Sequence, residues 1–238
     1  MTFGAKGDPE YLALCSRVLM VSAVARIMDP GCKADVMVII EGEQGCRKST
    51  AIKVLAGRFF SDDLGGEIGN KDVLDSMQGR WIIEMAELDH MSRSENNKFK
   101  AFLSRSVDRY RPAYGRMTND FPRQSIFVGT TNSNEYLKDS SGGRRFLPVD
   151  CWAKNRNDPI ITDDLSRDRE MLWGEAVDMF KRGVTWWPST QRESDLAAQV
   201  QSGRQVEDPW TSEILEGLNG YDPTMPDRKG TPYPKISI

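Results

Sequence analysis

The hydrophobic positions along this chain follow two spacings, one typical of helices and one typical of buried strands. Apolar residues recur every three or four positions from residue 11 to residue 28, which predicts a helix that ends at the turn-forming residues 29–31. Short unbroken apolar runs predict strands that are covered on both faces of a sheet. The predicted strands are 35–40, 81–88, 125–132 and 144–150, and the further predicted helices are 49–56, 96–104, 169–182 and 194–201.

The order of these elements predicts an α/β fold with a largely parallel central sheet flanked by helices, because alternating strands and helices are typical of parallel sheets. The length of 238 residues allows one large domain with a small appendage. We therefore expect a core at residues 1–155 and a short helical C-terminal extension at 156–220. Residues 221–238 contain four prolines and no periodicity, which predicts a tail or a linker.

The segment EGEQGCRKSTAIKVLAG, residues 41–57, follows the first predicted strand and runs into a helical pattern. A strand, a glycine-containing loop and a helix together favour anion binding, because backbone N–H groups converge there and the helix N-terminus adds positive potential. Lys48 would reach the β- and γ-phosphates of ATP, and Ser49 would bind Mg²⁺. The alternative is a tight strand-to-helix turn with a chance lysine. The loop residues predicted to bind the nucleotide are Gly42, Glu43, Gln44, Gly45, Cys46, Arg47, Lys48, Ser49 and Thr50.

Arg47 departs from the usual phosphate-loop pattern, in which a glycine directly precedes the lysine. A side chain at this position narrows the allowed backbone angles and would crowd the β-phosphate. Alternatively, the guanidinium turns outward, or it adds a second cation near the phosphates. On the first interpretation, we predict that Arg47→Gly raises ATP turnover. Equal or lower turnover in the glycine variant would show that the arginine is no defect.

Two carboxylates, Glu84 and Glu87, lie in the second predicted strand. A triphosphate site needs a carboxylate near Mg²⁺ and a group that orients the attacking water. Glu87 lies nearer to the carboxyl end of the strand, where open α/β sheets bind ligands. We therefore favour Glu87, together with Ser49, for the metal, and place Glu84 second, with an ion pair to Arg80 as its alternative. Asn132, at the tip of the third strand, would hydrogen-bond water and γ-phosphate unless it caps a turn.

Arg144 and Arg145 follow two glycines, on a predicted turn before the fourth strand. Arginine stabilises the charge that develops during phosphoryl transfer, either within its own subunit or from a neighbouring one. A pair of exposed arginines without a catalytic role is the alternative interpretation.

Residues 93–123 carry eight basic residues against three acidic ones, in a chain whose net charge is −3. Turn-forming residues within this segment predict a loop or a hairpin. Basic and aromatic side chains on a protruding loop suit single-stranded DNA, through phosphate contacts and base stacking. The alternative is a solvated loop whose arginines pair with acids or with a neighbouring subunit. The residues predicted to bind nucleic acid are Arg109, Tyr110, Arg111, Tyr114 and Arg116.

The composition is that of an ordinary globular protein, with 39% hydrophobic and 28% charged residues. Four cysteines without a C-x-x-C pair, and a single histidine, argue against a zinc site and suit a reducing compartment. No uninterrupted apolar run reaches 18 residues, and the N-terminus lacks the pattern of a signal peptide. We therefore expect no membrane association and a cytoplasmic location.

Several of these segments together resemble the virulence-associated protein E family. That family comprises phage- and island-borne P-loop ATPases, which are related to superfamily 3 helicases of the AAA+ class. The resemblance runs from about Phe3 to Trp210. It is carried by PGCKADVMVIIEGEQGCRKSTAIKVLAG, GRWIIEMAEL, KAFLSRSVDRYRPAYGR, PRQSIFVGTTN, GGRRFLPVD and DREMLWGEAVDMFKRG.

The resemblance implies a P-loop NTPase fold of the AAA+-like type. It implies that Lys48 and Ser49 form the Walker A site. It also implies that Glu84 and Glu87 lie in the Walker B region, and that Asn132 is the polar sensor.

The resemblance also implies an oligomeric ring, with a hexamer as one candidate, and a role in replicating mobile DNA. Arg145, with Arg144, is similar to the family's arginine that acts on a neighbouring subunit. Arg47 stands where the family has glycine. Larger members carry a primase-like region upstream, which does not occur in this sequence.

These observations lead us to expect a helicase-like ATPase that uses ATP and Mg²⁺ and acts on single-stranded DNA in phage or mobile-element replication, in a bacterial or phage-infected cell. One alternative is a nucleotide-binding module with impaired hydrolysis that regulates or binds another protein. A small-molecule kinase is a second alternative, although the sequence specifies no acceptor pocket. ATP turnover with and without single-stranded DNA separates the three.

Overall fold

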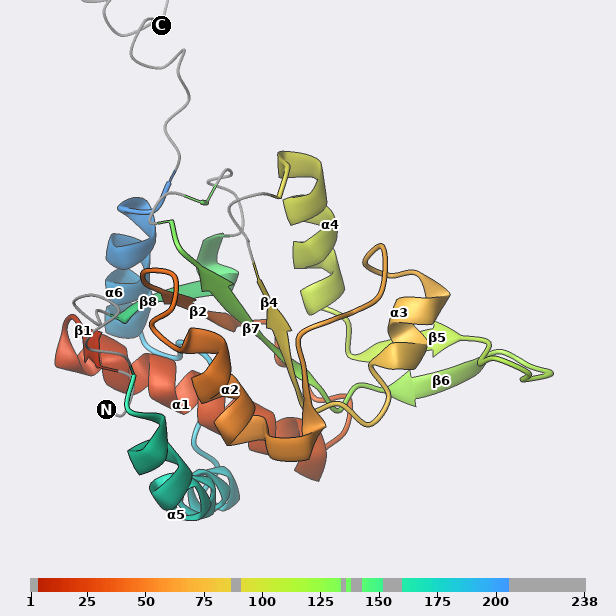
Figure 1. Cartoon of the computed structure of the whole chain (residues 1–238), viewed down its shortest axis with the longest axis horizontal. Coiled ribbons are helices and arrows are strands. Elements are labelled where there is room, and N and C mark those ends of the chain that lie inside the picture. Colours follow the sequence, from red (N-terminus) through yellow and green to blue (C-terminus); the bar gives the residue numbers. More distant parts are fainter. Residues whose placement is uncertain (1–3, 87–90, 134–135, 138–142, 152–159, 206–238) are drawn as a thin grey trace, which may run out of the picture. The chain divides into compact units, whose positions relative to one another are not determined.

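The structure is a computed structural model, and it describes residues 4–86, 91–133, 136–137, 143–151 and 160–205. The sheet has six strands in the order β1-β8-β2-β7-β4-β3 (Figure 1). Its inner strands run parallel to one another, and only β1 at one edge is antiparallel. The prediction of a largely parallel sheet is therefore confirmed. The strands are β1 (Ala5–Lys6), β2 (Met37–Glu41), β3 (Phe60–Ser61), β4 (Ile82–Met85), β7 (Ile126–Thr131) and β8 (Phe146–Cys151).

Helices cover both faces of this sheet, as predicted. Helices α1, α2 and α5 pack on one face, whereas α3, α4 and the β5–β6 hairpin pack on the other. Helix α6 packs against β8 and α1. Two short 3-10 turns, Gly57–Phe59 and Gly143–Arg145, precede β3 and β8. The other elements are α1 (Pro9–Met28), α2 (Lys48–Ala56), α3 (Lys71–Ser76), α4 (Arg93–Leu103), β5 (Val107–Tyr110), β6 (Asn119–Pro122), α5 (Thr162–Lys181) and α6 (Gln191–Ser202).

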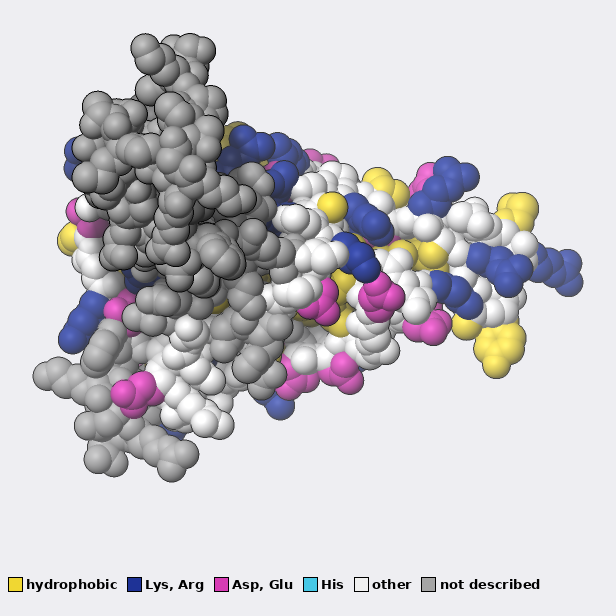
Figure 2. All heavy atoms as spheres, turned by 90° about the horizontal axis from the view of Figure 1, so that it is seen from above, with side chains coloured by type: hydrophobic (Ala, Val, Ile, Leu, Met, Phe, Trp, Pro, Cys, Tyr) yellow, Lys and Arg dark blue, Asp and Glu magenta, His cyan; other side chains and the backbone are white. Residues whose placement is uncertain are grey.

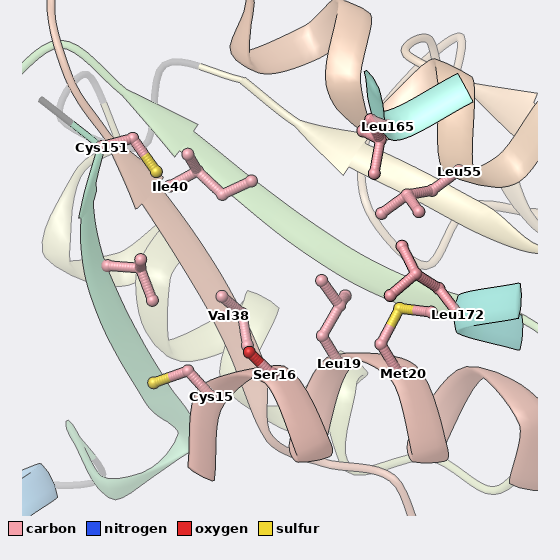
Figure 3. Close-up of a pocket in the computed structure, with 11 residues that line it drawn as sticks. Cys15, Ser16, Leu19, Met20, Val38, Ile40, Leu55, Cys151, Leu165 and Leu172 are labelled. Carbon is pink, nitrogen blue, oxygen red and sulfur yellow. The ribbon is translucent and has the colours of Figure 1, made fainter. Parts of the chain in front are cut away.

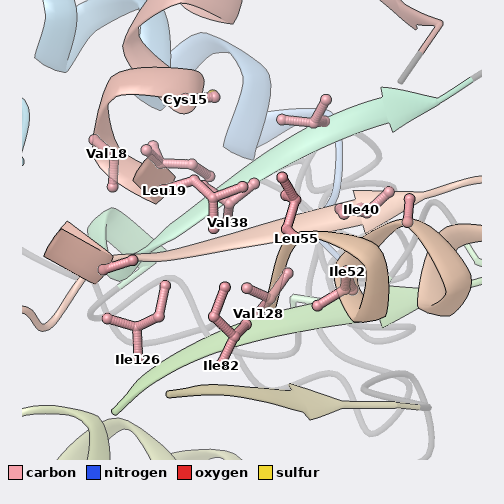
Figure 4. Packing of buried hydrophobic residues seen from close by; sticks show 14 of the residues in the cluster. Cys15, Val18, Leu19, Val38, Ile40, Ile52, Leu55, Ile82, Ile126 and Val128 are labelled. Carbon is pink, nitrogen blue, oxygen red and sulfur yellow. The ribbon is translucent and has the colours of Figure 1, made fainter. Parts of the chain in front are cut away.

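Alternation along the buried strands divides the core into two clusters. Val38 and Ile40 of β2 pack against α1 and α2, as Figure 4 shows, whereas Met37 and Ile39 pack on the opposite side with α4. Successive side chains of a strand point to opposite faces, so a strand between two helical layers needs apolar residues at every position. Burying each such side chain stabilises the fold by roughly 1.5–3 kcal/mol.

An apolar cavity of about 140 Å³ lies between α1, the sheet and α5 (Figure 3). Its lining is hydrophobic apart from two cysteines and Ser16, whose hydroxyl donates a 2.9 Å hydrogen bond to the carbonyl oxygen of Leu12. Because its described lining is almost entirely apolar, the cavity offers few partners to a water molecule or a polar ligand.

Helix α1 is the one helix in the described residues that is long and apolar enough to cross a membrane. Its most apolar window has a mean hydropathy of 1.6. The sequence shows no uninterrupted apolar run here because Glu10 and Arg17 lie within the helix. In the structure, 61% of that window is buried. Packing against the sheet therefore accounts for the composition of α1.

The predicted elements are all present, with shifted ends. The second strand stops at Met85, and part of its predicted range, residues 87–88, lies outside the described residues. Helix α5 begins at Thr162, seven residues before the predicted start at 169, because acidic residues in its first turn favour a helix N-terminus that apolar spacing does not reveal. Contacts place residues 1–205 in one compact unit, and the rest of the predicted extension and tail lies outside the described residues.

The β5–β6 hairpin confirms the prediction of a hairpin in the basic segment. Its base is held by Arg123, which donates from Nε to Asp108 Oδ2 at 2.9 Å and from Nη1 to the carbonyl oxygen of Phe102 at 2.7 Å. The two side chains of the ion pair are only 1% and 3% exposed. Arg123 is therefore part of the core and is not available to DNA.

We expect Arg123→Ala to lower the free energy of unfolding by about 3–5 kcal/mol, because it leaves the buried Asp108 carboxylate without its cation. The matched control is Arg109→Ala, since Arg109 pairs with Asp120 across the same hairpin but both side chains are more than half exposed. The control should lose less than about 1 kcal/mol. Urea denaturation measures both, and equal losses would show that burial of the pair is unimportant.

Candidate functional site

The loop between β2 and α2 lies at the carboxyl edge of the sheet and depends on two glycines with unusual backbone angles. Gly42 has φ 152° and Gly45 has φ 89°, values that residues with a Cβ rarely adopt. A Cβ on Gly42 would stand 2.7 Å from the carbonyl oxygen of Cys151 on β8. The loop therefore packs tightly against the neighbouring strand, and Gly42 permits that approach.

Arg47 occupies the last position of the loop, which is the N-cap position of α2, and its side chain makes no capping hydrogen bond. Its backbone is left-handed, with φ 66° and ψ 29°. Glycine adopts this conformation freely, whereas another residue loses about 1–2 kcal/mol. The structure thus keeps a glycine-like backbone at a non-glycine residue, and the narrowed backbone angles expected from a Cβ do not prevent the loop from forming.

Lys48 opens α2 and points back into the loop. Its ammonium donates to the carbonyl oxygens of Gly42 at 2.6 Å and Glu43 at 3.0 Å, and to Asn132 Oδ1 at 2.8 Å. The structure therefore brings the predicted lysine and the predicted polar sensor into direct contact. The lysine also lies beside the thiol of Cys46, which is buried, so Cys46 can contribute to a ligand site only through its backbone.

Glu84 on β4 receives two hydrogen bonds on the same oxygen. Ser49 Oγ and Thr130 Oγ1 each donate to Oε1 at 2.7 Å, which links α2, β7 and β4. The other oxygen, Oε2, is buried and has no hydrogen-bond partner among the residues that the structure describes. A buried carboxylate oxygen without a partner is costly, so this atom is suited to receive a cation or a proton.

These groups surround a cleft of about 360 Å³. Glu84 borders both this cleft and a neighbouring one of about 460 Å³. Asn132, Ser49 and Arg47 are exposed at the cleft, whereas Lys48 and Glu84 form its buried floor. The cleft is lined by Gln44, Gly45, Arg47, Lys48, Ser49, Thr50, Glu84, Ala86, Thr130, Thr131 and Asn132.

The structure describes only one of the two predicted acids. Glu84 lies in the cleft and contacts Ser49, whereas Glu87, which the sequence favoured, lies outside the described residues. The alternative for Glu84, an ion pair with Arg80, does not form in the structure: Glu84 accepts from the two hydroxyls, and Arg80 donates to the carbonyl oxygen of Phe60.

Sequence reasoning missed a second carboxylate cluster beside the loop. Glu41 ends β2 and accepts hydrogen bonds from Tyr136 at 2.7 Å and from Arg204, which forms an ion pair of 2.9 Å with it. Burial and the neighbouring Glu41 carboxylate raise the pKa of Tyr136 well above its ordinary value. An acid inside an apolar strand signals such a cluster, but its partners follow far later in the sequence.

Cys151, at the end of β8, lies against the other side of the loop. Burial raises the pKa of its thiol to about 12, with smaller contributions from nearby groups. The thiol is therefore neutral at physiological pH and adds no negative charge beside the loop.

Arg144 and Arg145 lie at the opposite edge of the sheet from the loop. They precede Phe146, which pairs with Met37 at the start of the parallel strand β2, whereas the loop follows the end of β2. Five strand residues separate the two edges by about 16 Å. Arg145 contacts Ser104 and Asp35, and Arg144 is exposed, so neither lies in the cleft of its own chain.

The hairpin carries a basic surface away from the cleft. Figure 2 shows dark blue side chains gathered at the right-hand end of the molecule, where Figure 1 places β5 and β6. Arg109, Arg111 and Arg116 are exposed, and Tyr114 is fully exposed at a positive φ of 63°.

The structure contradicts the base-stacking role predicted for Tyr110. Its ring is only 6% exposed and packs 4.7 Å from Phe121, and its hydroxyl donates to Asp75 at 3.1 Å. Alternation along β5 turns Tyr110 toward α3, whereas Arg109 points outward.

A model of the virulence-associated protein E-like domain matches residues 1–206, which include the loop, the cleft and the hairpin. The chain belongs to this family. The resemblance found in the sequence is thereby confirmed. A search of curated proteins found no match for the virulence-associated protein E-like chain.

Among solved structures, three apo structures of the NrS-1 C-terminal region are similar to this virulence-associated protein E-like chain. Their sequence identities are 14%, 15% and 13%, with TM-scores of 0.42, 0.42 and 0.41. Each alignment covers 89% of this chain and 51–52% of the other, so the chain spans about half the length of the structures it matches. We draw no functional argument from similarity at this level.

Gly42→Ala should destabilise the virulence-associated protein E-like domain by about 3 kcal/mol, because backbone strain and the clash with Cys151 act together. Gly79→Ala is the control: Gly79 also has a positive φ, 74°, but its Cβ would meet nothing within 4 Å. The control should lose only about 1–2 kcal/mol. Thermal unfolding of both variants measures the difference, and equal losses would mean that the loop does not pack tightly on β8.

Proposed function

We propose that this chain is a Mg²⁺-dependent ATPase that binds ATP in the cleft around Lys48 and acts on single-stranded DNA during phage or mobile-element replication. The observation that carries the proposal is the arrangement of Lys48, Ser49 and Glu84 at the N-terminus of α2. There a lysine and a hydroxyl meet a buried carboxylate, one oxygen of which has no partner within the described part of the chain.

Mg²⁺ is the cation that suits Glu84 and Ser49. Mg²⁺ prefers hard oxygen ligands and is usually held by one or two carboxylates together with substrate phosphates. A metal beside these two residues would supply positive charge for the bond-breaking step, while Ser49 and Glu84 hold it in place. Glu87 stays our prediction for the acid that orients the attacking water.

Lys48 and Asn132 suit the recognition of a terminal phosphate. The lysine holds the loop through two carbonyl oxygens, and its third hydrogen bond goes to the amide of Asn132. A phosphate oxygen would compete with Asn132 for this third donor, because an ammonium has only three. Binding of ATP would thereby break the contact between Lys48 and Asn132, the residue that directly follows β7.

The position of Arg145 and Arg144 favours assembly into a homo-oligomer. Because these arginines lie at the amino edge of the sheet, they can complete a phosphate site only in another subunit. A head-to-tail arrangement would bring the amino edge of one copy to the cleft of the next, and repeated rotation closes such an arrangement into a ring.

The hairpin is the element we propose for single-stranded DNA. Arg109, Arg111 and Arg116 can follow a phosphate backbone, and Tyr114 offers an exposed ring for stacking. The alternative, a nucleotide-binding module with impaired hydrolysis, keeps the same cleft and differs only in turnover.

Lys48→Ala should abolish measurable ATP binding, because the phosphates lose the cation at the centre of the loop. Lys53→Ala is the matched control, since Lys53 is an exposed lysine of the same helix outside the cleft. Isothermal titration calorimetry on folded variants measures the affinity. If Lys48→Ala binds ATP as tightly as the control does, the cleft is not the ATP site.

Glu84→Gln should keep ATP binding within about threefold and lower turnover by at least roughly a hundredfold, because the amide keeps the hydroxyl contacts but loses the charge for Mg²⁺. Glu87→Gln, measured beside it, tests the acid we favour for the water. Steady-state phosphate release reports both. Wild-type turnover in Glu84→Gln would contradict a metal role, and a wild-type protein that binds ATP without turnover would favour the regulatory alternative.

Joint replacement of Arg109, Arg111 and Arg116 by alanine should weaken single-stranded DNA binding and flatten its salt dependence. Each lost phosphate contact removes about 0.7 from the log–log slope. Tyr114→Ala should lower affinity with little change in slope. A salt titration of fluorescence anisotropy measures this, with a control triple variant at three other exposed arginines, Arg167, Arg182 and Arg192. Parallel slopes for the hairpin variant and the wild type would show that these arginines do not contact the DNA phosphates.

A further inference from the structure

We propose that Arg47 is a phosphate ligand of the cleft, supplied by the chain's own loop. This inference rests on the proposed function and assigns a role to the residue that departs from the usual loop pattern. Its basis is the conformation of Arg47, the bonding of its neighbour Lys48 and the balance of charge in the cleft.

The backbone of Arg47 has a left-handed conformation, which glycine, the usual residue at this position, adopts freely. With φ 66° and ψ 29°, it lets α2 begin at Lys48 and keeps the loop closed over the lysine. A left-handed arginine is strained, and strained residues persist where the surrounding structure holds them, most often at functional sites. The position therefore keeps glycine's geometry and adds a guanidinium.

The ammonium of Lys48 has no donor left in this structure. Its three N–H groups meet three oxygens, those of Gly42, Glu43 and Asn132, at 2.6–3.0 Å. Arg47 lines the same cleft, is exposed, and has no hydrogen bond or ion pair within the part of the chain that the structure describes. Among the described lining residues, Arg47 is thus the one cation with free donors.

The charge balance of the cleft gives Arg47 a further role. Three of the described lining residues are charged: Arg47 and Lys48 are positive, and Glu84 is negative. Lys48 and Glu84 cancel, so the net positive charge of the lining is that of Arg47. A triphosphate that stays anionic after binding Mg²⁺ would meet a lining of no net charge if Arg47 were absent.

The guanidinium suits this task, because its planar fork can donate two parallel hydrogen bonds to phosphate oxygens. The expectation drawn from the sequence was that Arg47→Gly raises ATP turnover. The cleft points to the opposite result, in which the glycine variant keeps the loop and loses affinity for phosphates.

The test compares ATP, inorganic tripolyphosphate and adenosine as ligands of the wild type, Arg47→Gly and Arg47→Lys, by isothermal titration calorimetry in the presence of Mg²⁺. Glycine accepts the left-handed backbone without strain, so the first variant removes the side chain and leaves the loop in place. Thermal unfolding checks that it is folded. Lys53→Ala removes the same charge from α2 outside the cleft and serves as the matched control.

We expect Arg47→Gly to weaken ATP and tripolyphosphate about tenfold or more, with adenosine and Lys53→Ala unchanged. Arg47→Lys should recover part of the loss, because it restores the charge and not the fork. If the wild type binds ATP, Lys48→Ala abolishes binding, and Arg47→Gly binds as tightly as the wild type, then this inference fails and the proposed function stands. If the wild type binds neither ATP nor tripolyphosphate, both fail.

Discussion

The hydrogen bonds that Ser49 and Thr130 donate to Glu84 are the contacts on which the arrangement of the cleft depends. They join the first turn of α2 to two strands of the sheet, one of which, β4, is not adjacent to β2. This meeting requires β7 to lie between β2 and β4, in a register that sets Thr130 beside Ile40 and Val128 beside Glu84. The position of the cleft is therefore a consequence of strand order. The loop follows β2, Asn132 follows β7, and Glu84 lies near the end of β4, so the three meet at the carboxyl edge of neighbouring parallel strands.

The residues to which we assign functions lie at opposite edges of the sheet. The carboxyl edge holds the cleft, whereas Arg144 and Arg145 lie at the amino edge, and the hairpin extends from the segment before β7. If the cleft binds ATP as we propose, a chain with this cleft at one edge and two arginines at the other is suited to repeated contacts between copies. The buried pair of Arg123 and Asp108 anchors the hairpin to the core, whereas the exposed Arg109 pairs with Asp120 only at the surface of the hairpin.

Local patterns in the sequence were sufficient for the four longer strands of the central sheet, the longer helices, the loop and the hairpin, whereas the short elements β1, β3 and α3 were not predicted. Each is encoded by neighbours in the chain: apolar runs, helical spacing, and glycines between a strand and a helix. Contacts between distant segments were not predictable in this way. Thr130 lies in the strand that ends near Asn132, and its hydrogen bond to Glu84 depends on strand register. Tyr110 was predicted to bind nucleic acid together with Tyr114. The sequence of a basic segment does not show whether an aromatic side chain faces solvent or packs against α3.

Two further features lay beyond sequence reasoning for the same reason. Arg204 reaches Glu41 across most of the chain's length, and nothing near either residue indicates the other. For Arg47, the sequence left open whether the side chain crowds the phosphates, turns outward or adds a second cation, and it did not reveal the left-handed backbone that the structure has at this residue.

Hydrogen–deuterium exchange of the loop with and without Mg²⁺ and ATP tests the central claim most directly. The claim is that the backbone N–H groups of residues 42–50 converge on phosphates. Saturating Mg-ATP should slow exchange of these amides while leaving the hairpin, residues 107–122, unchanged. Exchange in residues 42–50 that is the same with and without saturating Mg-ATP would contradict the account.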